Sequence, residues 1–220
     1  MINIAIDGPA GAGKSTIAKS LAHSLGYIYV DTGALYRAVG LNALRFGYDT
    51  KDEKLVTSTL SKIKVELKFI NGVQKIYLNN EDVSEDIRTP QASMAASNVS
   101  AIASVREYLF DLQQNIADKN NCIMDGRDIG TVVLPNAQVK IFLTASVEER
   151  ANRRYKELME KNIEIDYNSV LEEMEQRDFQ DSNREIAPLK PADDAIIVDT
   201  TNKSLPQVIN DIKNIVEERV

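Results

Sequence analysis

Short apolar runs alternate with longer amphipathic segments along most of this chain. Five runs have the length and composition of buried strands: residues 2–6, 27–30, 122–125, 139–143 and 195–198. The first intervening segment, 15–25, repeats apolar residues at helical spacing. Strands that alternate with helices predict an α/β chain whose parallel sheet is covered on both faces.

Capping signals mark the starts of several further helices. Thr89 precedes Pro90, a common helix start, and Ser204 is followed three residues later by Gln207. Capping boxes are predicted at Thr50–Glu53, Ser104–Glu107 and Ser146–Glu149. We therefore expect helices at 33–47, 50–62, 90–100, 104–116 and 168–181, and others that start near 146 and 204.

Residues 63–84 follow a different pattern, in which apolar and polar residues alternate. Asn71-Gly72, a hairpin signal, separates two such runs. A turn near Asn79–Asp82 precedes Val83, which we expect to extend a third strand. This segment is predicted to be a small antiparallel insertion in the βα chain.

Composition narrows the class of protein. A chain of 220 residues with 43% hydrophobic content is enough for one domain with a sizeable core. The net charge of −7 argues against a protein that coats nucleic acid. The chain shows no signal peptide and no apolar run long enough to span a membrane, and Cys122 is its one cysteine. We expect a cytoplasmic protein, with Cys122 buried and His23 packed or on the surface.

Residues 8–15 match the phosphate-loop template G-x-x-x-x-G-K-[ST] at every fixed position. A strand precedes the motif and a helix follows it, so a glycine-rich turn that binds nothing is the weaker alternative. Lys14 is predicted to reach the β- and γ-phosphates of a nucleotide, Ser15 to bind Mg²⁺, and Thr16 to support the α-phosphate. The predicted ATP-binding residues are Gly8, Pro9, Ala10, Gly11, Ala12, Gly13, Lys14, Ser15 and Thr16.

Two further polar segments follow predicted strands, where parallel sheets bind their ligands. Thr32, Tyr36 and Arg37 can face one ligand, although an ordinary helix start with Arg37 on the surface is equally compatible. Gly126–Gly130 follows another strand end. Asp125, just before it, could hold a water on Mg²⁺ or only satisfy nearby backbone.

Arginines recur in the helical region after residue 145. We expect Arg150 on a solvated charged face, whereas Arg153, Arg154, Arg177 and Arg184 suit a cleft that binds phosphate. No general base is evident, although a sugar or alcohol acceptor usually requires one. A phosphate acceptor is already ionised, so arginine-rich chemistry favours a phosphate as the acceptor.

Several motifs together resemble the bacterial cytidylate kinase family, in order and over nearly the whole chain. They are the phosphate loop, Asp31–Arg37, Ala95–Ser97 with Val105–Glu107, Asp125–Val133, and Arg177–Leu189. The resemblance implies a three-layer α/β P-loop kinase fold with a five-stranded parallel sheet, a small antiparallel insertion and a short helical lid. It implies one kinase domain over 1–220, with a monophosphate-binding region at 31–120 that includes 63–84, and a lid at 150–186.

The resemblance also implies transfer of the ATP γ-phosphate to CMP or dCMP with Mg²⁺, by a monomer that binds neither nucleic acid nor membrane. Its catalytic residues would be Lys14, Arg127, Arg153 and Arg184, with Arg153 acting from the lid on ATP. The CMP phosphate would meet Tyr36, Arg37, Arg127 and Arg184. The cytosine would meet Thr32, Ser97, Arg106 and Asp128, and the ribose would meet Arg177 and Asp181.

Base chemistry agrees with this assignment. Cytosine offers an N4 amino donor to Asp128 and acceptors to Arg106 and Ser97, whereas uracil reverses the pattern. Thr32 stands where the family often has serine, which keeps the hydroxyl and adds a methyl group. The alternatives are a P-loop kinase for another monophosphate or a small metabolite, and a nucleotide-dependent switch module. The switch would need an N-K-x-D signature, which the chain lacks.

Overall fold

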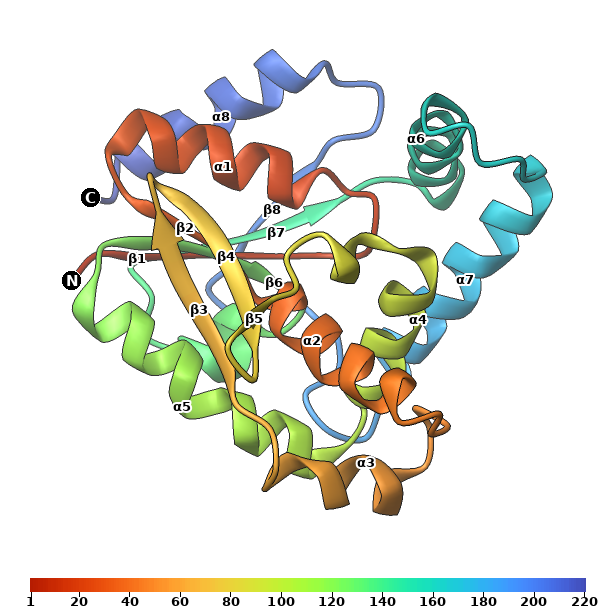
Figure 1. Cartoon of the computed structure of the whole chain (residues 1–220). Coiled ribbons are helices and arrows are strands. Elements are labelled where there is room, and N and C mark those ends of the chain that lie inside the picture. The colour runs from red at the N-terminus through yellow and green to blue at the C-terminus, as the bar shows by residue number, and fades with distance from the viewer. The chain divides into compact units, whose positions relative to one another are not determined.

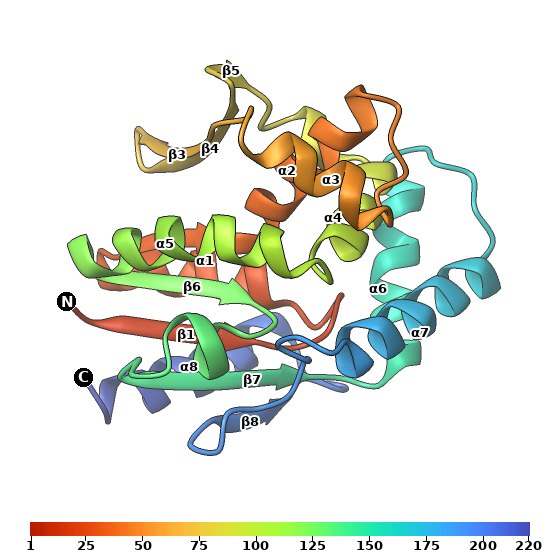
Figure 2. The ribbon, with the colours of Figure 1, turned by 90° about the horizontal axis from the view of Figure 1, so that it is seen from below.

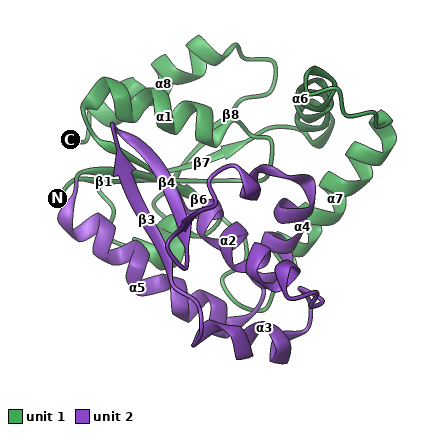
Figure 3. Cartoon of the chain, viewed as in Figure 1, with its two compact units in different colours: residues 1–29, 121–220 green, residues 30–120 purple.

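The computed structural model describes residues 1–220, which form two compact units (Figure 3). Unit 1 comprises Met1–Tyr29 and Asn121–Val220, and unit 2 comprises Val30–Asn120. None of the helices has the length and apolar character that crossing a bilayer requires.

The central sheet has five strands, the number that the apolar runs predict, and their order is β2-β6-β1-β7-β8. The strands are β1 (Asn3–Asp7), β2 (Ile28–Asp31), β6 (Cys122–Gly126), β7 (Val139–Thr144) and β8 (Ile196–Asp199). β1 lies between β6 and β7, parallel to both, and Asp7 is paired in register with Gly126. The segments that follow β1 and β6 therefore leave the sheet at the same level.

Helices α1 (Lys14–Leu25) and α8 (Leu205–Glu217) form the principal core of unit 1 with the sheet. Figure 1 shows the two helices side by side. Ile17 and Leu21 of α1 and Ile212 of α8 are fully or almost fully buried, together with Ile4 of β1 and Ile141 of β7. This packing holds the start of α1, and with it the phosphate loop, against the end of β1.

Helices α6 (Val147–Glu160) and α7 (Tyr167–Asn183) pack on each other around a smaller cluster that includes Leu158 and Met174 (Figure 2). Ser146 caps α6 by accepting from the Glu149 N–H, as predicted. These helices cover most of the predicted lid, 150–186, whose role as a lid stays a prediction.

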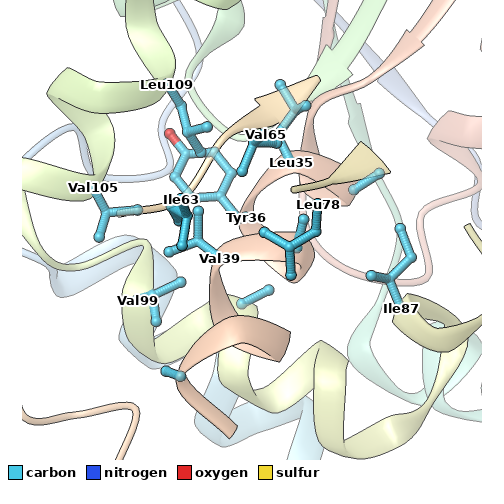
Figure 4. Close-up of a cluster of buried hydrophobic side chains, with 14 of the residues drawn as sticks. Leu35, Tyr36, Val39, Ile63, Val65, Leu78, Ile87, Val99, Val105 and Leu109 are labelled. Atoms are coloured by element: carbon cyan, nitrogen blue, oxygen red, sulfur yellow. The ribbon is translucent and has the colours of Figure 1, made fainter. Parts of the chain in front are cut away.

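Unit 2 combines four α-helices with a three-stranded antiparallel sheet. The helices are α2 (Thr32–Arg45), α3 (Glu53–Leu60), α4 (Pro90–Val99) and α5 (Ala103–Lys119), with a short 3₁₀ turn, η1 (Asp86–Arg88). The strands are β3 (Val65–Ile70), β4 (Val73–Leu78) and β5 (Glu81–Asp82). The antiparallel insertion is thereby confirmed. Figure 4 shows its Val65 and Leu78 packed with Leu35 and Val39 of α2 and Leu109 of α5.

Two predicted capping boxes are wrong. Asp52, not Thr50, caps α3 by accepting from the Leu55 N–H at 3.0 Å, and the Thr50 hydroxyl accepts from Asn98 instead. α5 begins before Ser104, whose hydroxyl pairs with Thr57 at 2.7 Å. In both places a tertiary hydrogen bond takes the side chain that the local pattern assigns to a cap.

Other local predictions hold or need small changes. Thr89 caps α4, and Ser204 forms the predicted capping box with Gln207. The third strand of the insertion is Glu81–Asp82, and Val83 is a buried core residue just beyond it. Cys122 is buried, which raises the pKa of its thiol to about 12, and His23 is exposed on α1.

Candidate active site

The phosphate loop, 8–15, depends on glycine for its backbone path. Gly8, Gly11 and Gly13 have φ angles of 145°, 74° and 90°, which L side chains rarely adopt. A Cβ atom at Gly8 would lie 2.0 Å from the backbone oxygen of Leu143 on β7. Gly13 then serves as the N-cap of α1, which starts at Lys14. The loop therefore ends at a helix N-terminus, a favourable position for anions.

Lys14 lies under this loop and is 7% exposed. Its Nζ donates to the backbone oxygen of Pro9 at 2.7 Å. Burial and, after it, the positive charges of Arg127 and Arg177 lower the pKa of Lys14 to about 7, against the opposing effect of the Asp125 and Asp7 carboxylates. Negative phosphates bound beside Lys14 would raise this pKa and favour the charged ammonium. Protonation of Lys14 would then be coupled to anion binding.

Ser15 and Asp125 form the donor set that fits Mg²⁺. The Ser15 Oγ donates to Asp125 Oδ2 at 2.7 Å, and the Tyr29 hydroxyl donates to Asp125 Oδ1 at 3.1 Å. A hydroxyl and a carboxylate supply hard oxygen ligands, the type that Mg²⁺ prefers. The structure contains no cluster of three or more metal-ligating side chains. These residues thus fit an ion held by few protein oxygens, with water and substrate phosphates completing its coordination.

Asp7, at the end of β1, is a buried carboxylate that sequence reasoning did not single out. Its Oδ1 accepts from the Ile129 N–H at 2.8 Å, and its Oδ2 accepts from the Gly130 N–H at 2.7 Å. Burial raises the pKa of Asp7 to about 6, although these two hydrogen bonds act in the opposite direction. Asp7 thereby connects the start of the phosphate loop to the segment after β6.

That segment carries Arg127 and Asp128 into a network with the end of α7. Arg127 Nε donates to Asp181 Oδ2 at 2.7 Å, and Arg184 Nη2 lies 3.4 Å from Asp128 Oδ1. Burial opposes ionisation of Asp181, but the charges of Arg127 and Arg177 outweigh it and keep the pKa of Asp181 below its usual value. The carboxylates thus orient guanidinium groups, which are of the type that can bind a phosphate through two parallel hydrogen bonds.

Arg153, the residue of α6 that is predicted to act on ATP, is held by contacts within unit 1. Arg153 Nε donates to Glu149 at 3.1 Å, and its Nη2 donates to the Thr200 backbone oxygen at 3.0 Å. In this conformation Arg153 is tied to the segment after β8. Its predicted action on ATP stays a prediction.

Arg150 does not lie on a solvated charged face, and that prediction is wrong. The residue is 4% exposed. Its guanidinium donates to the backbone oxygens of Ala145 and Ala10 and pairs with Asp178. The charge is buried because α7, the phosphate loop and the segment before α6 each supply one acceptor for it.

Unit 2 contains the other group of predicted residues. Tyr36 of α2 is buried, and the Arg106 guanidinium of α5 lies over its ring, 5.6 Å from the centroid. Arg106 also donates to the Ser100 backbone oxygen at 3.0 Å, and the Ser100 hydroxyl donates to the Ser97 backbone oxygen at 2.9 Å. Ser97, Ser100 and Arg106 are therefore linked in one buried group where α4 leads into α5.

Thr32 and Arg37 lie on the first turns of α2. Asp31 caps this helix by accepting from the Ala34 N–H at 3.0 Å, and its other oxygen accepts from Arg37 Nη2 at 2.7 Å. The Arg37 side chain is 16% exposed, so it does not extend into solvent as an ordinary surface arginine. Asp31 thus fixes both the helix start and the arginine one turn later.

The predicted residues therefore form two groups. Unit 1 holds Lys14, Ser15, Asp125, Arg127, Asp128, Arg177, Asp181 and Arg184, and unit 2 holds Thr32, Tyr36, Arg37, Ser97 and Arg106. Sequence reasoning missed Asp7, Tyr29, Asp31, Arg150 and Asp178. For Asp7 and Asp31 a signal was present, because both end predicted strands of a parallel sheet. Arg150 and Asp178 are identifiable only from their tertiary contacts.

Comparisons with known proteins relate the whole chain to one family. The sequence model of the family described as cytidylate kinase matches residues 4–218. The chain is 53% identical over 211 residues to a cytidylate kinase of Caldicellulosiruptor bescii, which covers 96% of this chain and 93% of the relative. It is 50% identical over 219 residues to a cytidylate kinase of Lactobacillus johnsonii, which covers 100% of this chain and 95% of the relative.

Solved structures of low sequence identity share the fold. An uncharacterized protein from Eubacterium ventriosum superimposes with a TM-score of 0.55 at 13% identity, over 100% of both chains. A shikimate kinase from Bacteroides thetaiotaomicron gives a TM-score of 0.50 at 12% identity, over 98% of each chain. These neighbours agree with the predicted α/β kinase fold.

Proposed function

This chain belongs to the cytidylate kinase family, and we propose that it transfers the γ-phosphate of ATP to CMP or dCMP, giving CDP or dCDP. Within unit 1, the observation that carries the proposal is the register of β1 and β6. Asp7 is paired with Gly126, so the phosphate loop and Arg127 leave neighbouring strands at the same level. A donor site and a phosphate-binding arginine at one sheet edge support transfer between two phosphorylated substrates.

The donor triphosphate is assigned to the phosphate loop. The backbone N–H groups of the loop and the N-terminus of α1 favour its negative charge, and Lys14 neutralises the β- and γ-phosphates. Ser15 and, through a water, Asp125 would hold Mg²⁺, while Tyr29 orients the Asp125 carboxylate. The ion, when bound, offsets charge on the β- and γ-phosphate oxygens.

The acceptor phosphate is assigned to Arg127 and Arg184 in unit 1, and to Tyr36 and Arg37 in unit 2. Each of the three arginines has a carboxylate partner: Asp181, Asp128 and Asp31 respectively. These carboxylates keep the guanidinium groups oriented, in side chains that are only 6–19% exposed. A dianionic phosphate offers the same bidentate acceptor geometry with more charge, and can compete for them.

The chemistry requires positioning rather than proton abstraction. A phosphate oxygen of CMP forms a bond to the γ-phosphorus of ATP as the bond from that phosphorus to the β,γ-bridging oxygen breaks. The nucleophile is already ionised at neutral pH, and no side chain has to remove a proton from it. Arg127 and Arg184 reduce the repulsion between the two anions, and Lys14 balances charge on the transferred group.

Base selectivity is assigned to Asp128, Ser97 and Arg106, with Thr32 as a further contact. Asp128 accepts a hydrogen bond from the cytosine N4 amino group, and the other two donate to O2 and N3. Uracil would place an oxygen against the Asp128 carboxylate and an N–H against the Arg106 guanidinium. Arg177 and Asp181 are assigned to the ribose, and Arg153 to ATP.

A coupled assay that compares CMP, dCMP, UMP and AMP as acceptors with ATP tests the proposal. We expect kcat/KM for CMP or dCMP to exceed the value for UMP by at least about tenfold, because unpaired polar groups in the site penalise the wrong base. Equal kcat/KM values for UMP and CMP would overturn the base assignment. ATP binding without transfer to any monophosphate would overturn the enzymatic assignment itself.

A further inference from the structure

The segment that carries Arg127 and Asp128 leads directly into a helical turn, η2 (Ile129–Val133), of π-helical geometry. The first N–H groups of any helix have no partner within it and are usually satisfied by a side chain at the N-cap. Asp128 occupies the N-cap position here, and aspartate is among the preferred capping residues. Its side chain nevertheless makes no capping hydrogen bond.

Asp7 performs the capping instead, from the neighbouring strand. Its two carboxylate oxygens accept from the Ile129 and Gly130 N–H groups, the first two of η2, at 2.8 and 2.7 Å. The two N–H groups that lack a partner within η2 are thereby satisfied by a residue 122 positions before Ile129 in the chain. Because the cap comes from β1, the Asp128 carboxylate turns elsewhere and lies 3.4 Å from Arg184.

Gly130 lies close to both neighbouring strands. A Cβ atom at this position would lie 3.4 Å from Asp7 Oδ2, an ordinary contact, and 3.2 Å from Cδ of the flexible Lys140 side chain on β7. An alanine here would therefore require only a small shift of Lys140, whereas a larger, branched side chain would press on the Asp7 carboxylate.

We propose that Asp7 is a positioning residue for the acceptor nucleotide: by capping η2, it fixes the segment that carries Arg127 and Asp128, the two residues assigned to the acceptor phosphate and to cytosine. This inference rests on the proposed function and extends it to a residue outside the substrate contacts. Asp7 also directly precedes the phosphate loop. The same side chain therefore fixes the acceptor-reading segment to the strand that delivers the donor site.

Asp7→Asn is the decisive variant. An asparagine has one carbonyl oxygen, so it can accept from only one of the two N–H groups, and its amide N–H₂ would face the other donor. We expect kcat/KM for CMP to fall by about 10- to 100-fold and the preference for CMP over UMP to shrink, because small misplacements of binding groups have effects of this size. KM for ATP should stay within about twofold, since Lys14 and the loop glycines are unchanged. The affinity of the variant for CMP, measured by calorimetry, should fall in parallel.

Asp211→Asn on α8 is the matched control, since it removes a carboxylate from an exposed ion pair with Lys203. Gly130→Val is the second variant: its branched side chain would press on the Asp7 carboxylate, so it should reproduce the selective loss for CMP while Asp7 remains intact. Should Asp7→Asn fail to fold, this variant decides the question. Unchanged CMP kinetics and an unchanged CMP-to-UMP ratio in folded Asp7→Asn would overturn the inference, as would equal losses for ATP and CMP. A wild-type chain that does not phosphorylate CMP would instead defeat the proposed function.

Discussion

The Arg150 guanidinium and the Asp178 carboxylate form a buried ion pair, with 2.6 Å between Nη2 and Oδ2, that joins α6 to α7. The same guanidinium donates to the Ala10 backbone oxygen of the phosphate loop at 3.1 Å. The planar trans peptide points the N–H of the next residue, Gly11, in the opposite direction to that oxygen. Arg150 therefore helps to fix the orientation of one peptide group in the loop.

Arg150→Lys should lower the midpoint of thermal unfolding and raise KM for ATP. A lysine ammonium is a point charge that cannot reach Ala10, Ala145 and Asp178 with the planar geometry of arginine. Partial loss of a buried ion pair leaves an unsatisfied carboxylate, and complete loss costs about 3–5 kcal/mol. Calorimetric unfolding and ATP saturation kinetics measure the two effects.

Arg45→Lys is the matched control for that variant. Arg45 pairs with Glu81 at 2.7 Å on an exposed face of unit 2, where such pairs contribute about 0–1 kcal/mol. Its stability and KM for ATP should therefore stay near the wild-type values. If Arg150→Lys behaved like this control, Arg150 would have no role in holding the loop.

Tyr29→Phe should raise the Mg²⁺ concentration needed for half-maximal activity by about tenfold, the lower end of the usual effect of residues that orient a metal-binding group. The substitution removes the hydroxyl that donates to Asp125 Oδ1 at 3.1 Å and keeps the ring, over which Lys19 Nζ lies. Activity titrated with Mg²⁺ at fixed ATP measures the change, and Mn²⁺ binding followed by electron paramagnetic resonance gives a reading without turnover. The control is Tyr27→Phe, because Tyr27 is a nearby tyrosine that packs on the apolar core. Identical Mg²⁺ requirements in both variants would contradict the orienting role.

The fold was largely predictable from the sequence, because buried parallel strands appear as uninterrupted apolar runs. The strands observed at Cys122–Gly126 and Val139–Thr144 extend one residue beyond the predicted 122–125 and 139–143. The phosphate loop was equally recognisable, since its glycine spacing is a backbone requirement. Local capping motifs gave wrong predictions where a residue distant in sequence binds the capping side chain, as Asn98 binds the hydroxyl of Thr50.

The candidate site was predictable only in part. Motifs identify side chains that meet a substrate, whereas the residues that hold those side chains are defined by contacts between distant segments. Asp7 supports η2 from another strand, and Arg150 is buried by Asp178 and by a carbonyl oxygen of the phosphate loop. A charge-rich helix such as α6 gives no local sign that one of its arginines is buried.

Asp128→Ala should reduce kcat/KM for CMP by about 100-fold or more while ATP affinity changes little. The substitution removes the acceptor assigned to the cytosine amino group and takes away a carboxylate partner of Arg184. Saturation kinetics with each substrate separate the two effects. An equal reduction for CMP and UMP would assign Asp128 to holding Arg184 rather than to reading the base.

Asp7 should also make the free energy of unfolding depend on pH. Its pKa is about 6 in the folded protein against an ordinary value of 3.8, because burial outweighs its two backbone hydrogen bonds. Nearby charges contribute as well, since Asp128 raises this pKa and Lys14 lowers it. The folded state thus holds the proton more tightly than the unfolded chain. The stabilisation is fully present below about pH 3.8 and is lost as pH rises towards 6, by up to about 3 kcal/mol.

Asp7→Asn removes this titration, so its stability relative to wild type should increase between about pH 4 and 6.5. Urea unfolding of both proteins across that range measures the difference, and Asp211→Asn controls for the loss of an exposed carboxylate. The expected result separates stability from function: the variant gains relative stability towards neutral pH, where its use of CMP should remain impaired. A relative stability that does not change with pH would mean that Asp7 titrates alike in the folded and unfolded chain. Its burial would then be offset in full by the Ile129 and Gly130 N–H groups.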